Sequence, residues 1–310
     1  MLETKKTTIP WFTLTVTVLC ITIYLLFYFL NEEMNAQTLF SKFGAPYAIQ
    51  IYQGQYWGVF SNSFLHINYY HLIINLISLW ILGAYIERRI SVFNFFLLGL
   101  FASIIVSISQ LTFSDDAGIG LTGVNYFFLA YIIVKSFKQD LFKLRAQYIF
   151  LNIAVFGILT AYYLNKDKDF NIGIEAMISG LIFGAIIGLS TYPKKKILPI
   201  VIGVSLMLLC SFSLKYAPWS AEWNYYKGYS AHEKGDYAEA KKYYKKAIEI
   251  NPDHAISKEN LHYITIDELS DLALTAHQNE NYILARKLYE RILELDPNNG
   301  WAKENIAKLP

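Results

Sequence analysis

The sequence predicts an all-α membrane protein: a bundle of transmembrane helices followed by a soluble α-helical domain. Residues 1–218 contain several long uncharged runs and carry 15 Lys/Arg against 10 Asp/Glu. Residues 219–310 contain no run able to cross a bilayer and carry 12 Lys/Arg against 15 Asp/Glu. A pattern of small and aromatic residues also repeats within the second part. These observations predict two parts that meet near residue 218.

The composition narrows the classes of function. The chain has 310 residues, is 54% hydrophobic and carries a formal net charge of +2. Both cysteines, Cys20 and Cys210, lie inside apolar runs, so we expect no structural disulfide, no metal site and no cofactor. The sequence has no basic stripe and no recognition motif for nucleic acid, so we expect no nucleic-acid partner.

The first predicted span is Trp11–Leu30. These twenty uncharged residues can cross a hydrocarbon core of about 30 Å. The run is too long for a signal peptide and lacks a small-residue cleavage pattern. Residues 31–63 are polar, aromatic and interrupted by glycines and a proline, so we expect an interfacial loop there. The first predicted segment, residues 1–54, combines this helix with most of the loop.

Six more spans are predicted after that loop. The second span runs from His71 to Ile86, and residues 193–218 contain the seventh. The third to seventh spans are the runs 91–111, 120–134, 147–164, 176–192 and 197–214.

Positive charge predicts the orientation of these spans. The N-terminus and the loops after the second, fourth and sixth spans hold eleven Lys/Arg, whereas the opposite side holds four. We therefore expect a multi-pass protein of the plasma or inner membrane, with a cytoplasmic N-terminus. Because the number of spans is odd, the C-terminal domain is expected outside the cytoplasm.

The second span carries two polar residues, His71 and Asn75, on one face, since they lie four residues apart. Such groups are costly in a membrane unless they are buried and hydrogen-bonded. The simplest interpretation is a polar pair that holds a helix bundle together.

The surrounding residues resemble a known family. The order Phe64-Leu65-His66, His71-x-x-x-Asn75, Leu79, Gly83 and Glu87 is similar to the second membrane helix of rhomboid intramembrane serine proteases. The run Gly54 to Trp57 resembles the end of that family's first loop. The resemblance implies a six-helix bundle with its rhomboid-like core at residues 55–192, to which the seventh helix is added.

Rhomboid proteases resemble one another in a serine within G-x-S-G on the fourth helix and a histidine within A-H-x-x-G-x-x-x-G on the sixth. The serine attacks the scissile carbonyl carbon and the histidine accepts its proton. Here Thr122 stands at the serine position and Met177 at the histidine position. A thioether cannot act as a general base, so the resemblance implies a catalytically degenerate member. Gly58 also replaces the arginine that usually follows Trp57.

Other positions follow from the same resemblance. His71 and Asn75 correspond to groups that stabilise the oxyanion of the tetrahedral intermediate. Ser179 is two residues from Met177 and is expected on the opposite side of its helix, and Glu175 is expected to be a solvated residue at a helix end. The glycines expected to pack helices closely are Gly120, Gly123, Gly180, Gly184 and Gly188.

Residues 219–310 resemble tetratricopeptide repeats (TPRs). The first copy spans Ala221 to His254, with the residues typical of the pattern at Gly228, Gly235, Tyr237, Ala240, Tyr244, Ala247 and Pro252. A second copy, Ile266 to Asn299, has Glu280 in place of the turn glycine. The two prolines lie 45 residues apart, so we expect one long helix from about His254 to about Asn279. Residues 298–309 are expected to form a capping helix.

The sequence supports three hypotheses. The first is a pseudoprotease that binds transmembrane or juxtamembrane segments of client proteins, with the TPR domain binding a protein or peptide partner. The second is an intramembrane serine-type endopeptidase that uses Thr122 as an unusual nucleophile. The third is a membrane anchor for the TPR domain. An interfacial anchor is a further interpretation of the aromatic group Trp219, Trp223, Tyr225, Tyr226 and Tyr229.

Overall fold

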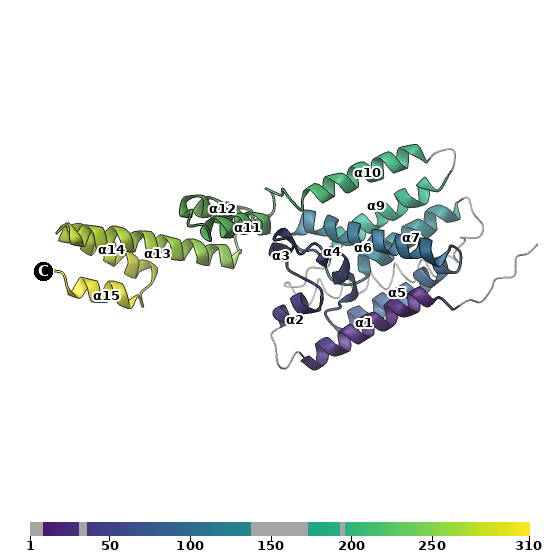
Figure 1. The fold of residues 1–310 in the computed structure, drawn as a ribbon, viewed down its shortest axis with the longest axis horizontal. Helices are drawn as coiled ribbons and strands as arrows, with labels where there is room; N and C mark the ends of the chain where they lie inside the picture. Colours follow the sequence, from purple (N-terminus) through teal and green to yellow (C-terminus); the bar gives the residue numbers. More distant parts are fainter. Residues whose placement is uncertain (1–8, 31–35, 138–172, 193–195) are drawn as a thin grey trace, which may run out of the picture. The chain divides into compact units, whose positions relative to one another are not determined.

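The computed structural model describes residues 9–30, 36–137, 173–192 and 196–310, and every regular element in these ranges is a helix. The chain divides into two compact units, residues 1–217 and 218–310 (Figure 1). Each unit is described separately below.

Among the described residues of the first unit, three helices are long and apolar enough to cross a membrane: α1 (Trp11–Leu30), α5 (Tyr69–Glu87) and α6 (Val92–Ser114). They confirm that the first three predicted runs are membrane-capable helices. Three shorter helices occupy later runs: α7 (Thr122–Ser136), α9 (Ile174–Ser190) and α10 (Ile197–Phe212). The fifth predicted span, 147–164, lies outside the described residues, so the number of seven spans stays a prediction.

The predicted interfacial loop is built from short helices. They are α2 (Ala36–Phe43), α3 (Ala48–Tyr52), α4 (Gly58–Ser61) and the 3₁₀ turn η1 (Asn62–Phe64). Gly44 follows α2 with φ of 121° and Gly54 follows α3 with φ of 112°. These left-handed backbone conformations favour glycine and stop the helices from continuing.

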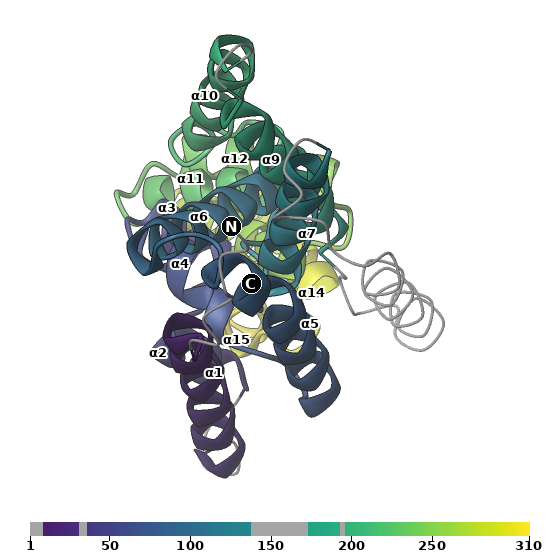
Figure 2. The same ribbon diagram turned by 90° about the vertical axis from the view of Figure 1, so that its right-hand side faces the viewer.

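Helices α5, α6 and α7 hold most of the buried apolar residues of this unit. Helix α1 packs on α5, α9 packs on α7, and α10 packs on α9 and α6, which leaves α1 and α10 on opposite sides of the bundle (Figures 1 and 2). Large apolar side chains remain exposed on these outer helices, such as Phe29 on α1 and Leu209 on α10. Exposed apolar residues on long apolar helices are the pattern expected for contact with lipid.

A buried carboxylate fastens α1 to the end of α5. Glu87 accepts hydrogen bonds from the backbone N–H groups of Phe12 (2.8 Å) and Thr13 (2.9 Å), and from the Thr13 hydroxyl (2.7 Å). The first N–H groups of a helix have no partner within the helix, so this carboxylate acts as the N-terminal cap of α1.

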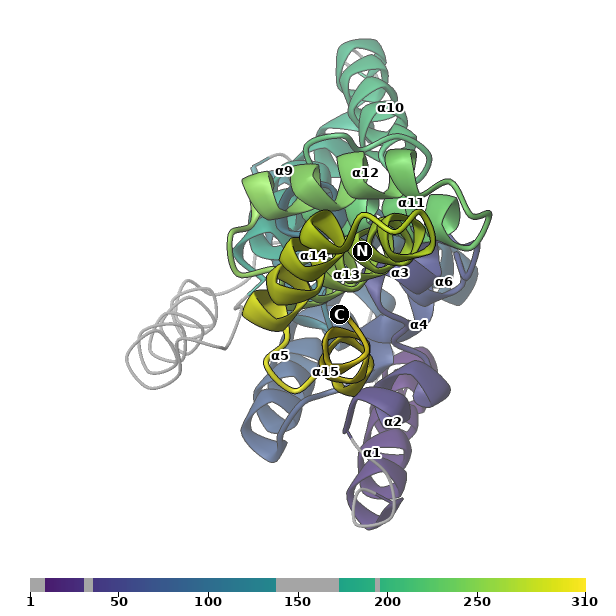
Figure 3. The same cartoon turned by 90° about the vertical axis from the view of Figure 1, so that its left-hand side faces the viewer.

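The second unit contains α11 (Ala221–His232), α12 (Tyr237–Ile250), α13 (Ala255–Gln278), α14 (Tyr282–Leu295) and α15 (Gly300–Ala307). The predicted long helix is confirmed by α13, and the predicted capping helix by α15. Helices α11 and α12 pair, as do α13 and α14, and the first part of α13 also packs on α12 (Figure 3).

Both repeats place equivalent residues in their cores. Tyr244 and Tyr289 are fully buried, and each hydroxyl lies beside a histidine Nδ1: His232 at 3.4 Å and His277 at 3.2 Å. The interpretation of the aromatic group after residue 218 as a membrane anchor is wrong for two of its members, Trp223 and Tyr225, because both are buried. Trp223 is 5% exposed and Tyr225 is 9% exposed, since both pack inside the first repeat.

The turn between the helices of each repeat has a left-handed residue. Gly235 has φ of 76° in the first repeat, and Glu280 has φ of 59° in the second. A residue with a Cβ atom pays a conformational penalty there that glycine avoids. The space around Gly235 is open, so any penalty of a side chain at that turn comes from the backbone alone.

We therefore expect Glu280→Gly to stabilise the second repeat by about 1 kcal/mol. The measurement is hydrogen exchange of the α13 and α14 amides in the full-length protein, where opening should become rarer. The matched control is Gly235→Ala, which should destabilise the first repeat by a similar amount. Faster exchange in Glu280→Gly would contradict the assignment of strain to this turn.

Candidate functional site

The polar face of α5 is organised by hydrogen bonds within its first turns. Asn68 caps the helix, because its side-chain oxygen accepts from the backbone N–H of His71 at 2.9 Å. The Asn75 amide Nδ2 donates to the backbone carbonyl of His71 at 2.9 Å, and Asn75 is fully buried. These bonds leave the Asn75 Oδ1 atom to face α7.

Thr122, the first residue of α7, meets this face. Its hydroxyl oxygen lies 3.2 Å from His71 Nε2 and 3.2 Å from Asn75 Oδ1. The sequence-predicted residues His71, Asn75 and Thr122 therefore form one cluster. Asn125, one turn further along α7, donates from Nδ2 to Asn75 Oδ1 at 3.1 Å and to the Asn75 carbonyl at 3.0 Å.

The hydrogen bonds decide which atom holds each proton. Asn75 Oδ1 can only accept, so the single hydroxyl proton of Thr122 is donated to Asn75. With that bond made, the contact between His71 Nε2 and the Thr122 oxygen is a hydrogen bond in the tautomer that protonates Nε2. Exchanging the oxygen and nitrogen of the Asn75 amide would place two oxygens 2.9 Å apart, which excludes the alternative. In this arrangement His71 is a donor to Thr122, which is the reverse of a general base.

Gly120 has no side chain, which leaves the space that the His71 ring occupies. Its φ is 91°, and a Cβ atom there would lie 2.6 Å from Cε1 of His71 and 3.3 Å from Cδ2 of His66. The two imidazole rings are 5.0 Å apart between centroids, and His66 is 2% exposed. Gly120, which the sequence grouped with the helix-packing glycines, thus lies before α7 and packs against histidine side chains.

Asn62 holds the loop that leads into α7. Its Nδ2 donates to the carbonyls of Ala117 (2.7 Å) and Gly118 (2.8 Å), and its own carbonyl accepts from Gly120 N–H at 3.0 Å. Its Oδ1 accepts from the Ser107 hydroxyl of α6 at 3.1 Å. The loop is therefore tied to α6 and η1 just before Thr122.

Helices α7 and α9 approach through glycine. A Cβ atom at Gly180 would lie 2.3 Å from the carbonyl oxygen of Gly123, and one at Gly184 would lie 2.2 Å from that of Phe127. Both distances are far inside normal contact, so larger residues would force the helices apart. Gly188 continues the row at the far end, where a Cβ atom would lie 2.9 Å from the Val134 side chain.

The same contact places Met177 near the start of α7. A Cβ atom at Gly123 would lie 2.8 Å from the carbonyl of Ala176, so the chain neighbours of Thr122 and Met177 touch. Met177 is partly buried, and its thioether neither donates a proton nor accepts one at any ordinary pH. The arrangement holds a hydroxyl and a methionine where a hydroxyl and a base would be needed for acyl transfer.

Two further residues of α9 were singled out by sequence. Ser179 donates its hydroxyl to the carbonyl of Ala176 at 3.1 Å, so that hydroxyl is used within its own helix. One carboxylate oxygen of Glu175 is buried without a hydrogen-bond partner in the described part of the chain, which differs from the expected solvated carboxylate.

Gly58 is enclosed by its own loop. A Cβ atom at Gly58 would lie 2.1 Å from Cγ and 2.6 Å from Cδ of Pro46. The proline ring is rigid and occupies the space into which any side chain would extend. The loop therefore leaves no room at residue 58 for the arginine that the family usually has there.

Sequence reasoning missed two residues of this site. Asn125 lies three residues after Thr122 on an apolar helix, and that spacing could have identified it. Asn62 could not have been found in this way, because its partners at residues 117 and 118 lie 55 and 56 positions along the chain.

The structure thus defines a helical membrane protein with a buried cluster of hydroxyl, imidazole and amide groups where α5 meets α7. Family comparison matches the Rhomboid domain to residues 53–194 and the tetratricopeptide repeat to residues 221–254 and 269–299. The chain therefore carries a Rhomboid domain and two tetratricopeptide repeats, which confirms both resemblances.

Similar curated proteins carry the same domain. Rhomboid protease GlpG of Yersinia pseudotuberculosis serotype I (strain IP32953) is 26% identical over 183 residues, which cover 59% of this chain and 63% of that protein. Rhomboid protease GluP of Bacillus subtilis (strain 168) is 31% identical over 182 residues, which cover 56% of this chain and 35% of that protein. The match spans less than two thirds of the length of each of these two relatives.

The packing of Gly58 against Pro46 can be tested by a double-mutant cycle. Gly58→Ala should destabilise the full-length protein, because the added methyl group meets the Pro46 ring, at a cost of about 1–3 kcal/mol. Pro46→Ala removes the two ring atoms in conflict, so it should relieve most of that cost in the double variant. Thermal denaturation in detergent measures all four proteins.

Equal destabilisation by Gly58→Ala with and without Pro46→Ala would show that the two residues do not interact. The matched control is Gly300→Ala, since nothing lies within 4 Å of a Cβ atom at Gly300. That variant should leave the unfolding temperature unchanged or slightly raised.

Proposed function

We propose that this protein is a rhomboid-fold pseudoprotease that binds transmembrane segments of client proteins without cleaving them. The observation that carries the proposal is the proton arrangement at Thr122. The Thr122 hydroxyl donates to Asn75 and accepts from His71. Met177 stands at the position of the family's base. The TPR domain is proposed to recruit a protein or peptide partner.

The energetic argument favours binding over cleavage. Loss of the nucleophile or the base of such a site typically costs about 10⁴-fold or more in rate. If His71 acted as the base, the Thr122 hydroxyl would have to donate to His71 Nε2 and no longer to Asn75 Oδ1. His71 Nε2 would then lack the proton that it could donate to the oxyanion. The row of glycines packs α9 against α7, so this part of the fold does not depend on catalytic chemistry.

The cluster also offers polar atoms for a client backbone. In the described part of the chain, His71 Nδ1 is buried and has no hydrogen-bond partner. Unpaired polar atoms at such depth are costly, and the peptide groups of a bound segment would satisfy them. This supports client binding at α5 and the loop before α7.

One observation favours the second hypothesis, a serine-type intramembrane endopeptidase. Thr122 lies within hydrogen-bond distance of an imidazole, and curated relatives bear the name rhomboid protease. The third hypothesis, a membrane anchor for the repeats, predicts that the α5 cluster has no role in client contact.

Cleavage of a single-span substrate in proteoliposomes tests these alternatives. Wild type should not cleave, and neither should Thr122→Ala. The reverted pair, Thr122→Ser with Met177→His, should gain activity if only the chemistry is missing, because a hydroxyl and a base then face each other. Ser179→Ala is the control, since its hydroxyl serves its own helix.

Cleavage by wild type that disappears in Thr122→Ala, but not in Ser179→Ala, would replace the pseudoprotease proposal with the endopeptidase. Photo-crosslinking of the same substrate tests the anchor hypothesis. The pseudoprotease proposal expects His71→Ala with Asn75→Ala to reduce crosslinking. Unchanged crosslinking in that double variant would favour the anchor.

We further propose seven spans, a cytoplasmic N-terminus and TPR repeats outside the cytoplasm. The charge distribution supports this orientation. The two native cysteines are buried, Cys20 fully and Cys210 at 6% exposure, so thiol labelling of wild type should be weak. An impermeant thiol reagent on intact cells should label Asn298→Cys, which lies on the exposed end of the second repeat.

The control is Arg88→Cys at the end of α5, which should be labelled only after the cells are permeabilised. Five predicted spans separate the two positions. Labelling of both from the same side would therefore mean an even number of crossings between them and would overturn the count of seven.

A further inference from the structure

One face of the first repeat combines tyrosine rings with carboxylates. On α11, Glu222, Tyr225, Tyr229 and Glu233 are spaced by three, four and four residues, so they share one side of the helix. The rings of Tyr225 and Tyr229 lie 6.3 Å apart between centroids. Tyr225 is 9% exposed and packs inside the repeat, whereas the partly exposed Tyr229 ring lies between the two acids on this side of the helix.

The first half of α13 extends this face. Glu259 and Tyr263 lie four residues apart, and the Tyr263 hydroxyl donates to Glu259 at 3.1 Å. His254, at the start of α13, joins the two helices, because its ring lies 5.4 Å from that of Tyr225. We name this surface the acidic tyrosine face; its residues are Glu222, Tyr225, Tyr229, Glu233, Glu259 and Tyr263.

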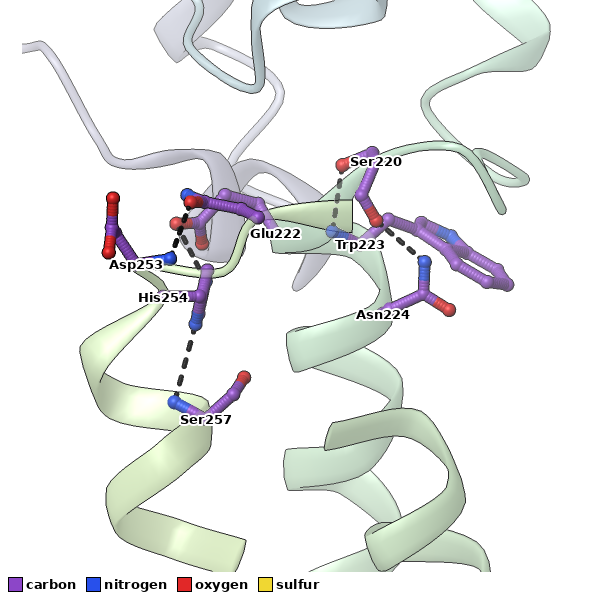
Figure 4. Close-up of polar contacts among 8 residues, drawn as sticks. Ser220, Glu222, Trp223, Asn224, Asp253, His254 and Ser257 are labelled. Atoms are coloured by element: carbon purple, nitrogen blue, oxygen red, sulfur yellow. Dashed lines mark hydrogen bonds and ion pairs between the residues drawn. The ribbon is translucent and has the colours of Figure 1, made fainter. Parts of the chain in front are cut away.

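His254 does not neutralise Glu222. It is the N-cap of α13, and its Nδ1 accepts the Ser257 backbone N–H at 3.3 Å (Figure 4). A ring nitrogen that accepts carries no proton, so the imidazole is neutral and donates from Nε2 to Glu222 at 3.3 Å. Glu222 therefore keeps its negative charge.

No lysine or arginine neutralises the other two acids either. The ion pairs between residues 218 and 310 that involve lysine or arginine are Lys241–Glu268, Arg291–Glu294 and Lys308–Glu304. The exposed lysines of the first repeat's second helix, Lys242, Lys245 and Lys246, lie on α12. Both helices of this repeat carry both signs of charge, but within residues 218–310 the three carboxylates of the acidic tyrosine face have no lysine or arginine partner in an ion pair.

The tyrosine pKa values reflect the same environment. Burial and then the charge of Glu222 raise the pKa of Tyr225, and the hydrogen bond and charge of Glu233 raise the pKa of Tyr229. The hydrogen bond and charge of Glu259 raise the pKa of Tyr263. Apart from Tyr229, which acts on Tyr225, the charges that shift these three pKa values belong to carboxylates.

We propose that the acidic tyrosine face binds an extended partner segment that carries lysine or arginine side chains. Three unneutralised carboxylates attract such a segment, and the faces of Tyr229 and Tyr263 accept cations by cation–π contact. Tyr263 is 54% exposed, so its ring is accessible. An acidic segment or an anionic lipid surface is repelled by the same charges. This inference rests on the proposed recruiting role of the repeats and specifies the partner's chemistry.

The test uses the full chain in proteoliposomes and two fluorescent peptides of about ten residues, which extend to about 35 Å. One alternates lysine with serine and the other alternates glutamate with serine. Fluorescence anisotropy at low ionic strength should show binding of the lysine peptide only, and added salt should weaken it. Crosslinking of the single-span client is measured in the same preparation.

Two sets of variants assign the binding to this face. Replacing Glu222, Glu233 and Glu259 by Gln should weaken the lysine peptide about tenfold. The matched control replaces Glu239, Glu249 and Glu290 by Gln, which changes the net charge equally on α12 and α14, and should have little effect. Replacing Tyr229 and Tyr263 by Leu should weaken binding of the lysine peptide about threefold or more. Replacing them by Phe, which keeps the face of each ring, should leave binding unchanged.

Three outcomes would overturn the inference. They are equal binding of both peptides, no binding of the lysine peptide, and equal loss of lysine-peptide affinity in the two glutamine variants. Client crosslinking separates this result from the proposed function. A preparation that crosslinks the client but does not bind the lysine peptide counts against the partner chemistry alone. One that cleaves the client, or fails to crosslink it, counts against the pseudoprotease.

Discussion

The close approach of α7 and α9 is the contact on which the membrane unit depends. The backbone carbonyls of Gly123 and Phe127 lie where Gly180 and Gly184 have no side chains. Between helices in lipid there is little hydrophobic gain, so packing of this kind supplies much of the attraction. With α7 held against α9, its first residue, Thr122, lies against the polar face of α5.

At that junction, stability and reactivity draw on the same hydrogen bonds. Polar groups inside a membrane protein must find partners, and Thr122, Asn75 and Asn125 find them in one another. The bonds that join α5 to α7 also direct the Thr122 proton away from His71. A hydroxyl that is fully used as a structural donor and acceptor is a poor nucleophile unless a base removes its proton, and α9 offers methionine there.

The C-terminal unit is packed differently, around a helix that belongs to both repeats. Two repeats share the long helix α13, whose first half covers α12 and whose second half pairs with α14. Burial of equivalent tyrosines, Tyr244 and Tyr289, stabilises the two hairpins in the same way. Small and aromatic residues fill the core, so the outer faces can carry charge: Glu222 and Glu259 lie on α11 and early α13, and exposed lysines lie on α12.

The sequence by itself determined the first three membrane-capable helices, the two repeats, the long α13 and the Rhomboid domain. These depend on local periodicity and residue type, which need no knowledge of distant neighbours. Only the tertiary structure showed that Asn62 ties down the loop before α7, that Pro46 encloses Gly58, and that Trp223 is buried within the first repeat. The tertiary structure also showed that the Thr122 hydroxyl donates to Asn75, which lies 47 residues away and whose amide orientation is set by its own helix.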